Sequence, residues 1–312
     1  MNAHTVRPGT ASSALTRHRS AAAVAGPGRP AGALQLSLSL VAAGVLAQIA
    51  YPLLSGSALR AATIVSVVLL AAAAIVHAGA NWGLRSALIV LAVAGGLGLA
   101  AETIGVHTGF PFGAYSYADT LGPQLASVPL VVPLAWTMLG YPSLLLGRRL
   151  ARHLSTRRVR MLTAVTGGVC LSGWDLFLDP QMVAQGHWSW AHPAPALPGV
   201  PGVPLTNYAG WLLVSILMIA VLDHLLPRAR RDLAESDVPV RTFIQQNGSP
   251  VAVLAWTWCG STVGNLVFFD RPWVALYGGV VMGLVVLPYL LLTRADAASN
   301  AQAIPNTRIE NS

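Results

Sequence analysis

Two aspartates, Asp175 and Asp179, stand four residues apart in an apolar stretch, GWDLFLDPQMVAQGHWSW at 173–190. Positions i and i+4 share one face of a helix, so the two carboxyl groups are expected side by side. Pro180 follows them, and a proline at that place predicts that the helix ends there. A low dielectric and a neighbouring acid both favour the neutral form of a carboxyl group. At least one of these acids is therefore expected to keep its proton near neutral pH and to serve as a general acid.

A third acid, Glu102, occupies a comparable place in the sequence. GAYSYA at 113–118 and GHWSWA at 186–191 share the frame Gly-x-aromatic-Ser-aromatic-Ala at an offset of 73 residues, and that offset places Glu102 on Asp175. Acids inside membrane-spanning segments are usually functional. The alternative for all three acids is a hydrogen bond to the loop backbone or to one another.

The similarity continues into the segments that follow, where VPLVVPLAW at 128–136 matches VPLTNYAGW at 203–211 at an offset of 75 residues. We interpret the pattern as a duplication of a helix that ends in an acid, an outer aromatic loop and a returning helix with a tryptophan. Two copies that run in the same direction predict an axis along the membrane normal, with the acids on facing helices. Chance agreement between apolar segments is the alternative.

Aromatic residues recur at equal positions in both loops. Ring faces stabilise cations, and a neutral carboxylic acid beside such rings in an apolar pocket is what protonation of an alkene requires. An interfacial belt is the alternative and the better interpretation for Phe110 and Phe112. The recurring pairs are Tyr115 and Tyr117 in the first loop and Trp188 and Trp190 in the second.

The composition shows which elements must position these residues. The chain has 312 residues, of which 54% are hydrophobic and 10% charged, and its mean hydropathy is +0.60. Apolar runs of about twenty residues recur along it, which predicts an all-α fold, a polytopic transmembrane helical bundle. The expected spans are 34–54, 59–78, 84–104, 124–146, 161–178, 207–226, 250–269 and 273–293.

The remaining segments fall outside this bundle. Residues 1–33 are rich in Ala, Ser, Gly, Pro and Arg without an apolar period, and we expect a disordered leader there. Residues 34–294 form one transmembrane domain with repeat units at about 84–146 and 161–226, and residues 295–312 form a polar tail.

The positive charges support an arrangement with both termini cytoplasmic, in the cytoplasmic membrane. All 19 basic residues are arginines, and the eight spans place seventeen of them inside, against Arg60 and Arg271 outside, as the positive-inside rule expects. The net charge of +8 therefore says little about nucleic acid, and no nucleic-acid partner is expected. Cys170 and Cys259 lie in apolar runs, which supports neither a disulfide nor a thiolate metal site.

The histidines also give no metal-ligand spacing, so no metal is expected. Those in the outer segments are His107, His187 and His192.

The motifs together resemble a known family, the CruF-type carotenoid hydratases, which include bisanhydrobacterioruberin hydratases. The residues that carry the resemblance are ETIGVHTGFPFGAYSY at 102–117, WDLFLDP at 174–180, WSW at 188–190 and GVPLTNYAGW at 202–211, within a similarity over roughly 85–290. The resemblance implies addition of water across the terminal C1=C2 double bond of an acyclic carotenoid end, without a redox cofactor. It implies a lipophilic carotenoid substrate taken from the bilayer, and leaves room for association with other membrane enzymes of the same pathway.

The chemistry assigns a role to each candidate residue. Asp175 is expected to donate the proton to C2, which leaves a cation at C1, and Glu102 or Asp179 is expected to orient and deprotonate the attacking water. The tyrosines and tryptophans of the two loops line the cation. Asn207 is expected to hold the water or to cap its helix, and Trp211, one turn further along, bounds the pocket.

Two other classes of function fit parts of the pattern. DLFLD at 175–179 has the Asp-x-x-x-Asp form by which intramembrane prenyltransferases hold magnesium and a diphosphate, but the outer loops lack the basic residues that bind a diphosphate. A proton-coupled transporter would use the same acids as a relay. It would need a polar path to the inner side from His77, Asp223 and His224, for which helix-end capping or packing is the alternative.

Overall fold

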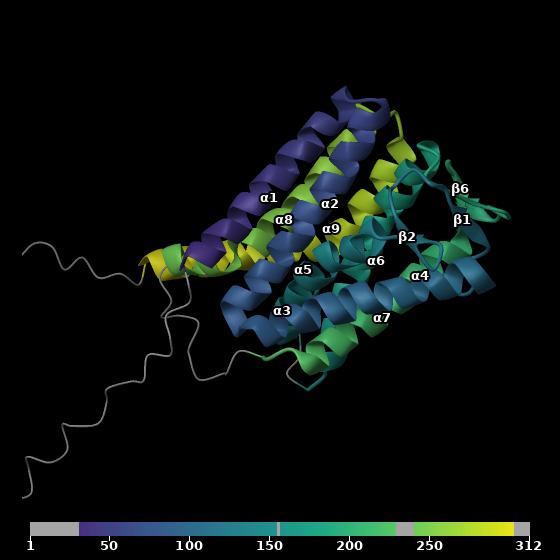
Figure 1. Ribbon diagram of the computed structural model, residues 1–312. Helices are drawn as coiled ribbons and strands as arrows, with labels where there is room; N and C mark the ends of the chain where they lie inside the picture. The colour runs from purple at the N-terminus through teal and green to yellow at the C-terminus, as the bar shows by residue number, and fades with distance from the viewer. Residues whose placement is uncertain (1–30, 155–156, 229–239, 303–312) are drawn as a thin grey trace, which may run out of the picture.

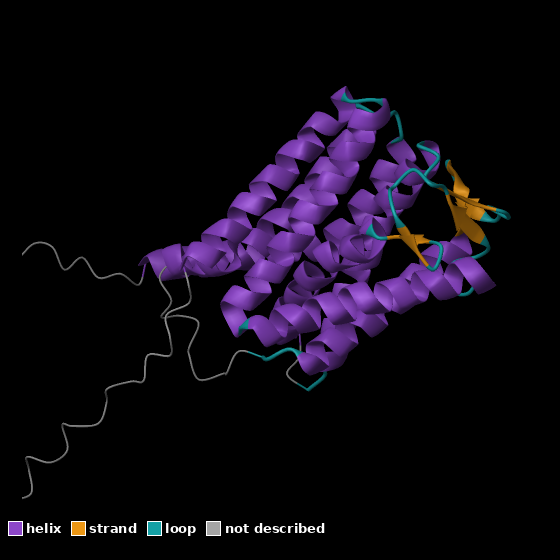
Figure 2. Cartoon of the chain, viewed as in Figure 1, coloured by secondary structure: helices purple, strands orange, loops and turns teal. Residues whose placement is uncertain are grey.

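Long helices form a bundle with short β-strands gathered at one end, and the computed structural model describes residues 31–154, 157–228 and 240–302. Figure 1 follows the chain through the bundle, and Figure 2 shows the strands together beyond one end of the helices. The expected all-α helical bundle is confirmed. Most of the expected leader and the end of the expected polar tail lie outside the described residues.

The described part of the chain contains eight long helical runs, in the order of the eight expected spans. In the third run, a π-helical turn, η2 (Leu91–Gly95), joins α3 (Leu84–Val90) to α4 (Gly96–Thr108), and a 3-10 turn, η1 (Tyr51–Leu53), follows the first helix. The other helices are α1 (Ala31–Ala50), α2 (Gly56–Trp82), α5 (Val131–Leu154), α6 (Val159–Ala184), α7 (Leu205–Leu225), α8 (Val240–Val267) and α9 (Pro272–Gln302).

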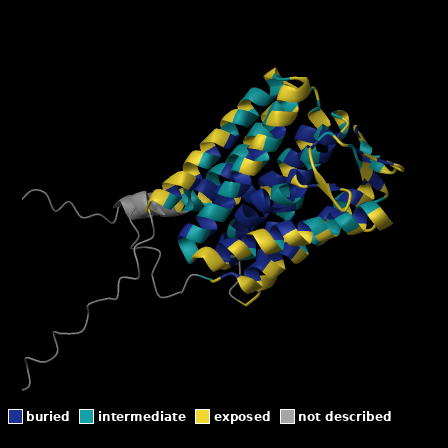
Figure 3. Ribbon diagram, viewed as in Figure 1, coloured by how far each residue is buried: buried dark blue, intermediate teal, exposed yellow. Residues whose placement is uncertain are grey.

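Most of these helices are suited to a bilayer, so the chain is a multi-pass membrane protein. α5 and α8 carry more polar residues than the rest, and α5 lies mainly among other helices (Figure 3). The six helices of the described residues that are long and apolar enough to cross a membrane are Ala31–Leu53, Gly56–Trp82, Leu84–Thr108, Val159–Ala184, Leu205–Leu225 and Pro272–Ala295.

Two predicted helix boundaries are wrong, the start of one helix and the end of another. The span expected from residue 124 begins at Val131, because β2 (Gln124–Leu125) and β3 (Val128–Pro129) pair as a hairpin before it. Pro180 does not end α6, which continues to Ala184. A proline inside a helix removes its own bond to the carbonyl four residues back and crowds that carbonyl, which kinks a helix or ends it; here α6 resumes beyond Pro180. The acids therefore lie inside helices rather than at their last residues.

The two aromatic loops pair with each other at the end of the bundle. β1 (Tyr115–Tyr117) and β4 (Trp188–Trp190) are antiparallel, with Ser116 opposite Ser189. These serines are equivalent residues of the expected repeat. An antiparallel pair in which equivalent residues face each other is what a two-fold axis between two copies produces, so the register supports the duplication, which stays a prediction.

The hydrogen bonds that flank this pair follow the same symmetry. The amide of Ala118 donates to the carbonyl of His187 over 2.8 Å, and the amide of Ala191 donates to the carbonyl of Ala114 over 2.9 Å. The offset of 73 residues relates one bond to the other. The last hairpin, β5 (Ala196–Leu197) and β6 (Val200–Pro204), lies in the proline-rich segment that leads into α7.

The core is centred on α5 and α6, which are the most deeply buried helices in Figure 3. They approach so closely that a β-carbon at Gly147 would lie 2.5 Å from the carbonyl oxygen of Thr163. Small residues at such crossings allow helices to pack in a membrane, where the hydrophobic effect does not drive them together. This close contact holds α6, which carries two of the acids, in a fixed position against α5.

Candidate active site

Glu102 of α4 forms the first acid cluster with three aromatic donors. The hydroxyl groups of Tyr115 and Tyr117 donate to Glu102 Oε2 over 2.5 and 2.8 Å, and Trp136 Nε1 donates to Glu102 Oε1 over 3.0 Å. The two tyrosines stand on alternate positions of β1, and Trp136 comes from α5. A β-carbon at Gly98 would lie 2.6 Å from the Trp136 ring, so the glycine makes room for this indole.

The two aspartates of α6 form the second cluster, around Asn207 at the start of α7. Asn207 Nδ2 donates to Asp175 Oδ2 over 3.1 Å and also to Asp179 Oδ2, and the two carboxyl groups interact directly. Trp188 Nε1 donates to Asp179 Oδ1 over 3.1 Å. Asp175 and Asp179 therefore lie side by side, one helical turn apart, as their spacing predicts.

Hydrogen-bond donors are distributed unequally between the clusters. Glu102 accepts three bonds from neutral donors, which suits an ionised, acceptor-only carboxylate. The aspartates share two donor groups between them, and Asp175 Oδ1 is buried without a hydrogen-bond partner among the described residues. A proton shared between Asp175 and Asp179 would supply a donor that this pair otherwise lacks.

The tyrosines that contact Glu102 stay protonated over a wide pH range. Burial raises the pKa of Tyr115 and of Tyr117 above its ordinary value, and the nearby Glu102 carboxyl group raises both further. A phenol in a low dielectric beside a carboxylate loses its proton with difficulty. Both hydroxyl groups therefore remain hydrogen-bond donors to Glu102.

Aromatic rings surround the two clusters. The Trp136 and Trp211 rings are stacked with centroids 3.9 Å apart, and the Tyr115 and Trp190 rings are stacked at 5.6 Å. Trp174 meets Trp211 edge to face at 6.0 Å. Trp136 and Trp211 are equivalent in the second part of the expected repeat, so this stack also joins the two copies.

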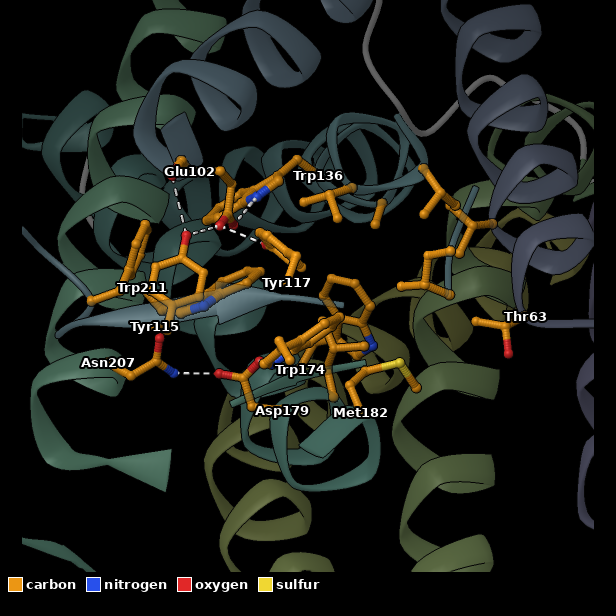
Figure 4. Close-up of a pocket in the computed structure, with 18 of the residues that line it drawn as sticks. Thr63, Glu102, Tyr115, Tyr117, Trp136, Trp174, Asp179, Met182, Asn207 and Trp211 are labelled. Atoms are coloured by element: carbon orange, nitrogen blue, oxygen red, sulfur yellow. Dashed lines mark hydrogen bonds between the residues drawn. The ribbon is translucent and has the colours of Figure 1, made fainter. Parts of the chain in front are cut away.

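The acids and rings enclose a small space that we call the carboxyl cavity, of about 60 Å³. Figure 4 shows Glu102 and Asp179 on different sides of it, with the tyrosine rings of β1 between them. Eight of the nine predicted site residues line it, namely Glu102, Tyr115, Tyr117, Asp179, Trp188, Trp190, Asn207 and Trp211.

Asp175 is the exception among the predicted residues. It is fully buried and lies behind Asp179 and Asn207, and it does not line the carboxyl cavity. The sequence places both aspartates on one helix face, but the rotation of that face depends on how α6 packs. Asp179 is consequently the aspartate that faces the cavity.

The structure also adds residues that the sequence analysis did not assign to the site. Phe112, expected in an interfacial belt, is 1% exposed, lines the cavity and accepts a hydrogen bond from Trp190 Nε1 at its carbonyl over 2.9 Å. Phe110 is 66% exposed, as expected for a belt residue. Trp136 and Trp174 line the cavity as well, and the repeat match at Trp211 was the one signal that pointed to Trp136.

The polar residues expected near the inner helix ends have structural partners. Asp223 accepts a hydrogen bond from Arg148 Nε over 2.8 Å, and His77 Nδ1 lies 2.8 Å from the Tyr141 hydroxyl. Arg148 also donates to the carbonyl of Leu226 over 2.9 Å, at the end of α7. These contacts are those of helix-end capping and packing, the alternative to a proton relay.

The histidines of the segments expected outside the membrane are dispersed in the described part of the chain. His187 bonds to Thr120 at 2.7 Å and to the Gln185 side chain at 3.1 Å, whereas His107 contacts the carbonyl of Thr103 on its own helix. Among the described residues, no group of three or more His, Cys, Asp or Glu side chains is arranged to hold a metal ion.

Comparison with known proteins identifies the family. The model of a family described as "Carotenoid biosynthesis protein" matches residues 62–287, which include every acid and aromatic residue of the cavity. The chain belongs to this carotenoid biosynthesis family. A bisanhydrobacterioruberin hydratase of Haloarcula japonica is 32% identical to this carotenoid biosynthesis protein over 194 residues, 60% of the chain and 58% of the relative. The chain thus aligns with less than two thirds of that relative. No solved structure matches the chain.

Proposed function

We propose that the protein is a carotenoid 1,2-hydratase, which adds water to the terminal C1=C2 double bond of an acyclic carotenoid end. The observation that carries the proposal is a pair of buried carboxyl groups that share few hydrogen-bond donors, one of which stands at the wall of a cavity lined mainly by aromatic and aliphatic side chains. Membership of a carotenoid biosynthesis family and a relative named as a hydratase support the choice of substrate and reaction.

Asp179 is the proposed proton donor in the first step. Its proton passes to C2 of the alkene, the π electrons form the new C–H bond, and a tertiary cation remains at C1. Trp188 and Asn207 hold the carboxyl group in place through two hydrogen bonds. Asp175 is a positioning residue, because it reaches the substrate only through Asp179 and Asn207.

The walls of the cavity stabilise the cation that this step creates. Ring faces of Trp190 and Tyr115 provide negative electrostatic potential, and the Glu102 carboxylate provides a full negative charge at the opposite side. Both are fixed before the charge appears, so little reorganisation accompanies the reaction. The apolar surroundings strengthen these interactions relative to water.

Glu102 acts in the second step as the base. Water bonds to C1 through its oxygen lone pair and loses one proton to Glu102, directly or through the hydroxyl of Tyr117, which bonds to the same carboxylate. The product is a tertiary alcohol with one hydrogen added at C2. Exchange with solvent then removes the proton from Glu102 and returns a proton to Asp179. Both groups are restored, so the reaction consumes only the alkene and one water.

The site is proposed to open towards the outer leaflet, with both termini in the cytoplasm. The arginine distribution supports this orientation, because the loops around the carboxyl cavity lie at the end of the bundle that is poor in arginine. A reporter fused after Arg158 is expected inside, and one inserted at Pro195 outside. Finding both on one side of the membrane would refute the orientation.

Expression in a host that makes an acyclic carotenoid tests the activity. The expected pigment gains the mass of one water per modified end, and an Asp179→Asn control in the same host leaves it unchanged. A gain of a five-carbon unit would instead identify a prenyltransferase. Unchanged pigment from several acyclic substrates, with the protein present in the membrane, would contradict hydration and favour a transport role for the buried acids.

A further inference from the structure

A second cavity, which we call the lateral cavity, adjoins the carboxyl cavity between α1, α2, α6 and α8. Its volume is about 440 Å³, against about 60 Å³ for the carboxyl cavity. Thr63 of α2 lies beyond Trp174 and Met182 from Asp179 in Figure 4 and lines both cavities. The residues shared by both are Thr63, Val67, Trp174, Leu178 and Met182.

The rim of the lateral cavity is apolar and exposed. Ile49, Val263 and Phe268 line it and are 51%, 52% and 58% exposed. In a membrane protein such side chains meet lipid, so an apolar molecule in the bilayer has direct access to this space. Met182 stands where the cavities join, and its flexible side chain can move to widen the passage.

One wall of the lateral cavity is polar. Thr257, Ser261 and Asn265 follow one another at intervals of four residues, so they occupy one face of α8, and all three line the cavity. Asn265 is 3% exposed, and its Nδ2 donates to the carbonyl of Ser261 over 2.9 Å. Its Oδ1 is buried and accepts no hydrogen bond from a described residue. A buried acceptor of this kind usually has a donor, from water or from a ligand.

We propose that the lateral cavity binds the chain of the polyene while its end group occupies the carboxyl cavity, and that Asn265 Oδ1 accepts a hydrogen bond from an O–H group bound there. The inference rests on the proposed function, because the adjoining carboxyl cavity is where the reacting end is placed. The carboxyl cavity is too small for more than an end group, and a long molecule that enters it must extend through a neighbouring space. The O–H group belongs either to a hydroxyl on the polyene or to a water molecule.

Filling the lateral cavity tests the first part. Ser261→Phe puts a ring into the lateral cavity at a residue that does not line the carboxyl cavity, and Leu266→Phe on the same helix is the matched control, since Leu266 is 54% exposed and lines neither cavity. Binding of an acyclic carotene to the purified full chain is followed by quenching of tryptophan fluorescence, in an Asp179→Asn background that prevents turnover. Ser261→Phe is expected to weaken binding about tenfold or more, and Leu266→Phe to leave it unchanged. Equal binding by both would overturn the proposed channel.

Asn265→Leu tests the second part with two polyenes that differ by one hydroxyl group. Lower hydration of the hydroxylated polyene alone, by about tenfold, identifies a hydroxyl of the ligand as the donor, whereas an equal loss for both identifies a bound water. No change for either polyene would remove Asn265 from the site. Absence of hydration by the wild-type protein itself would instead contradict the proposed function, and the fluorescence experiment would still decide whether the lateral cavity binds a polyene.

Discussion

Replacing Asp179 by asparagine removes a proton at the wall of the carboxyl cavity while keeping the size and shape of the side chain. Trp188 and Asn207 donate to different oxygens of Asp179, and the amide keeps an oxygen at only one of these two positions, so one of the two hydrogen bonds is lost. Its NH₂ group is not acidic enough to protonate an alkene. The variant therefore isolates the loss of the general acid from a loss of packing.

The two consequences differ greatly in size. A positioned general acid contributes about 10²- to 10⁴-fold to the rate, and hydration is expected to fall by that factor. The donor left unpaired in the apolar core costs about 1–3 kcal/mol of folding stability. The protein is therefore expected to accumulate in the membrane with a lowered unfolding temperature, and its loss of activity is expected to exceed by far any loss of folded protein.

The assay compares hydrated pigment per folded protein for three variants. Asp119→Asn makes the same chemical change at an exposed loop residue and is expected to match the wild type. Hydration by Asp175→Asn is expected to lie between that of Asp179→Asn and that of Asp119→Asn. Its pH profile is also expected to change, because this substitution alters the partner of the acid rather than the acid itself. Near-normal product from a folded Asp179→Asn enzyme, with product lost in Asp175→Asn, would refute this assignment and make Asp175 the proton donor.

The other predictions concern the cation, the base and the loop contacts. Glu102→Gln is expected to lower hydration about 10²- to 10³-fold with little change in protein level, measured in the same pigment assay. Trp190→Phe should retain more activity than Trp190→Leu if the ring face stabilises the cation; equal activities would argue for packing alone. Gly98→Ala is expected to displace Trp136 from Glu102, seen as changed tryptophan fluorescence together with reduced hydration. Burial, and secondarily Arg60, lowers the pKa of His187 below 6.5. The unfolded chain therefore binds a proton at this histidine more readily than the folded protein, and the unfolding temperature is expected to fall as the pH drops below about 6.5. His187→Asn should reduce that fall.

Much of the site was accessible from the sequence because helical and strand periodicities are local. The spacing of Asp175 and Asp179 predicts that they are neighbours, and the repeat predicts that the two aromatic loops are equivalent. The pairing of Tyr115 with Trp190 across β1 and β4 is consistent with that equivalence. The order of the eight helices follows from apolar segments whose length matches the bilayer.

Other features depend on packing that no local pattern encodes. Asp175 lies behind Asp179 because α6 is rotated by its contacts with α5 and α7, and a helical wheel gives no absolute rotation. The continuation of α6 beyond Pro180 depends on neighbouring elements that hold the helix. Phe110 and Phe112 flank Pro111, and each has a glycine on its other side, yet only Phe112 lines the cavity.

The lateral cavity is the clearest case of a feature hidden from the sequence. Its walls come from α1 and α2 early in the chain and from α6 and α8 much later in it, and its polar residues Thr257, Ser261 and Asn265 resemble ordinary polar residues of a membrane helix. Only the arrangement of those helices shows that the three face an open space next to the acids.

Hydration by the purified protein in deuterium oxide tests the central claim most directly. The wild-type enzyme, given an acyclic carotene, is expected to form a tertiary alcohol at C1 that carries one deuterium at C2 for each modified end, as measured by mass spectrometry and NMR. Asp179→Asn is expected to yield almost none of this product. A product without deuterium at C2, or a carotene recovered unchanged after incubation with folded protein, would contradict acid-catalysed addition of water.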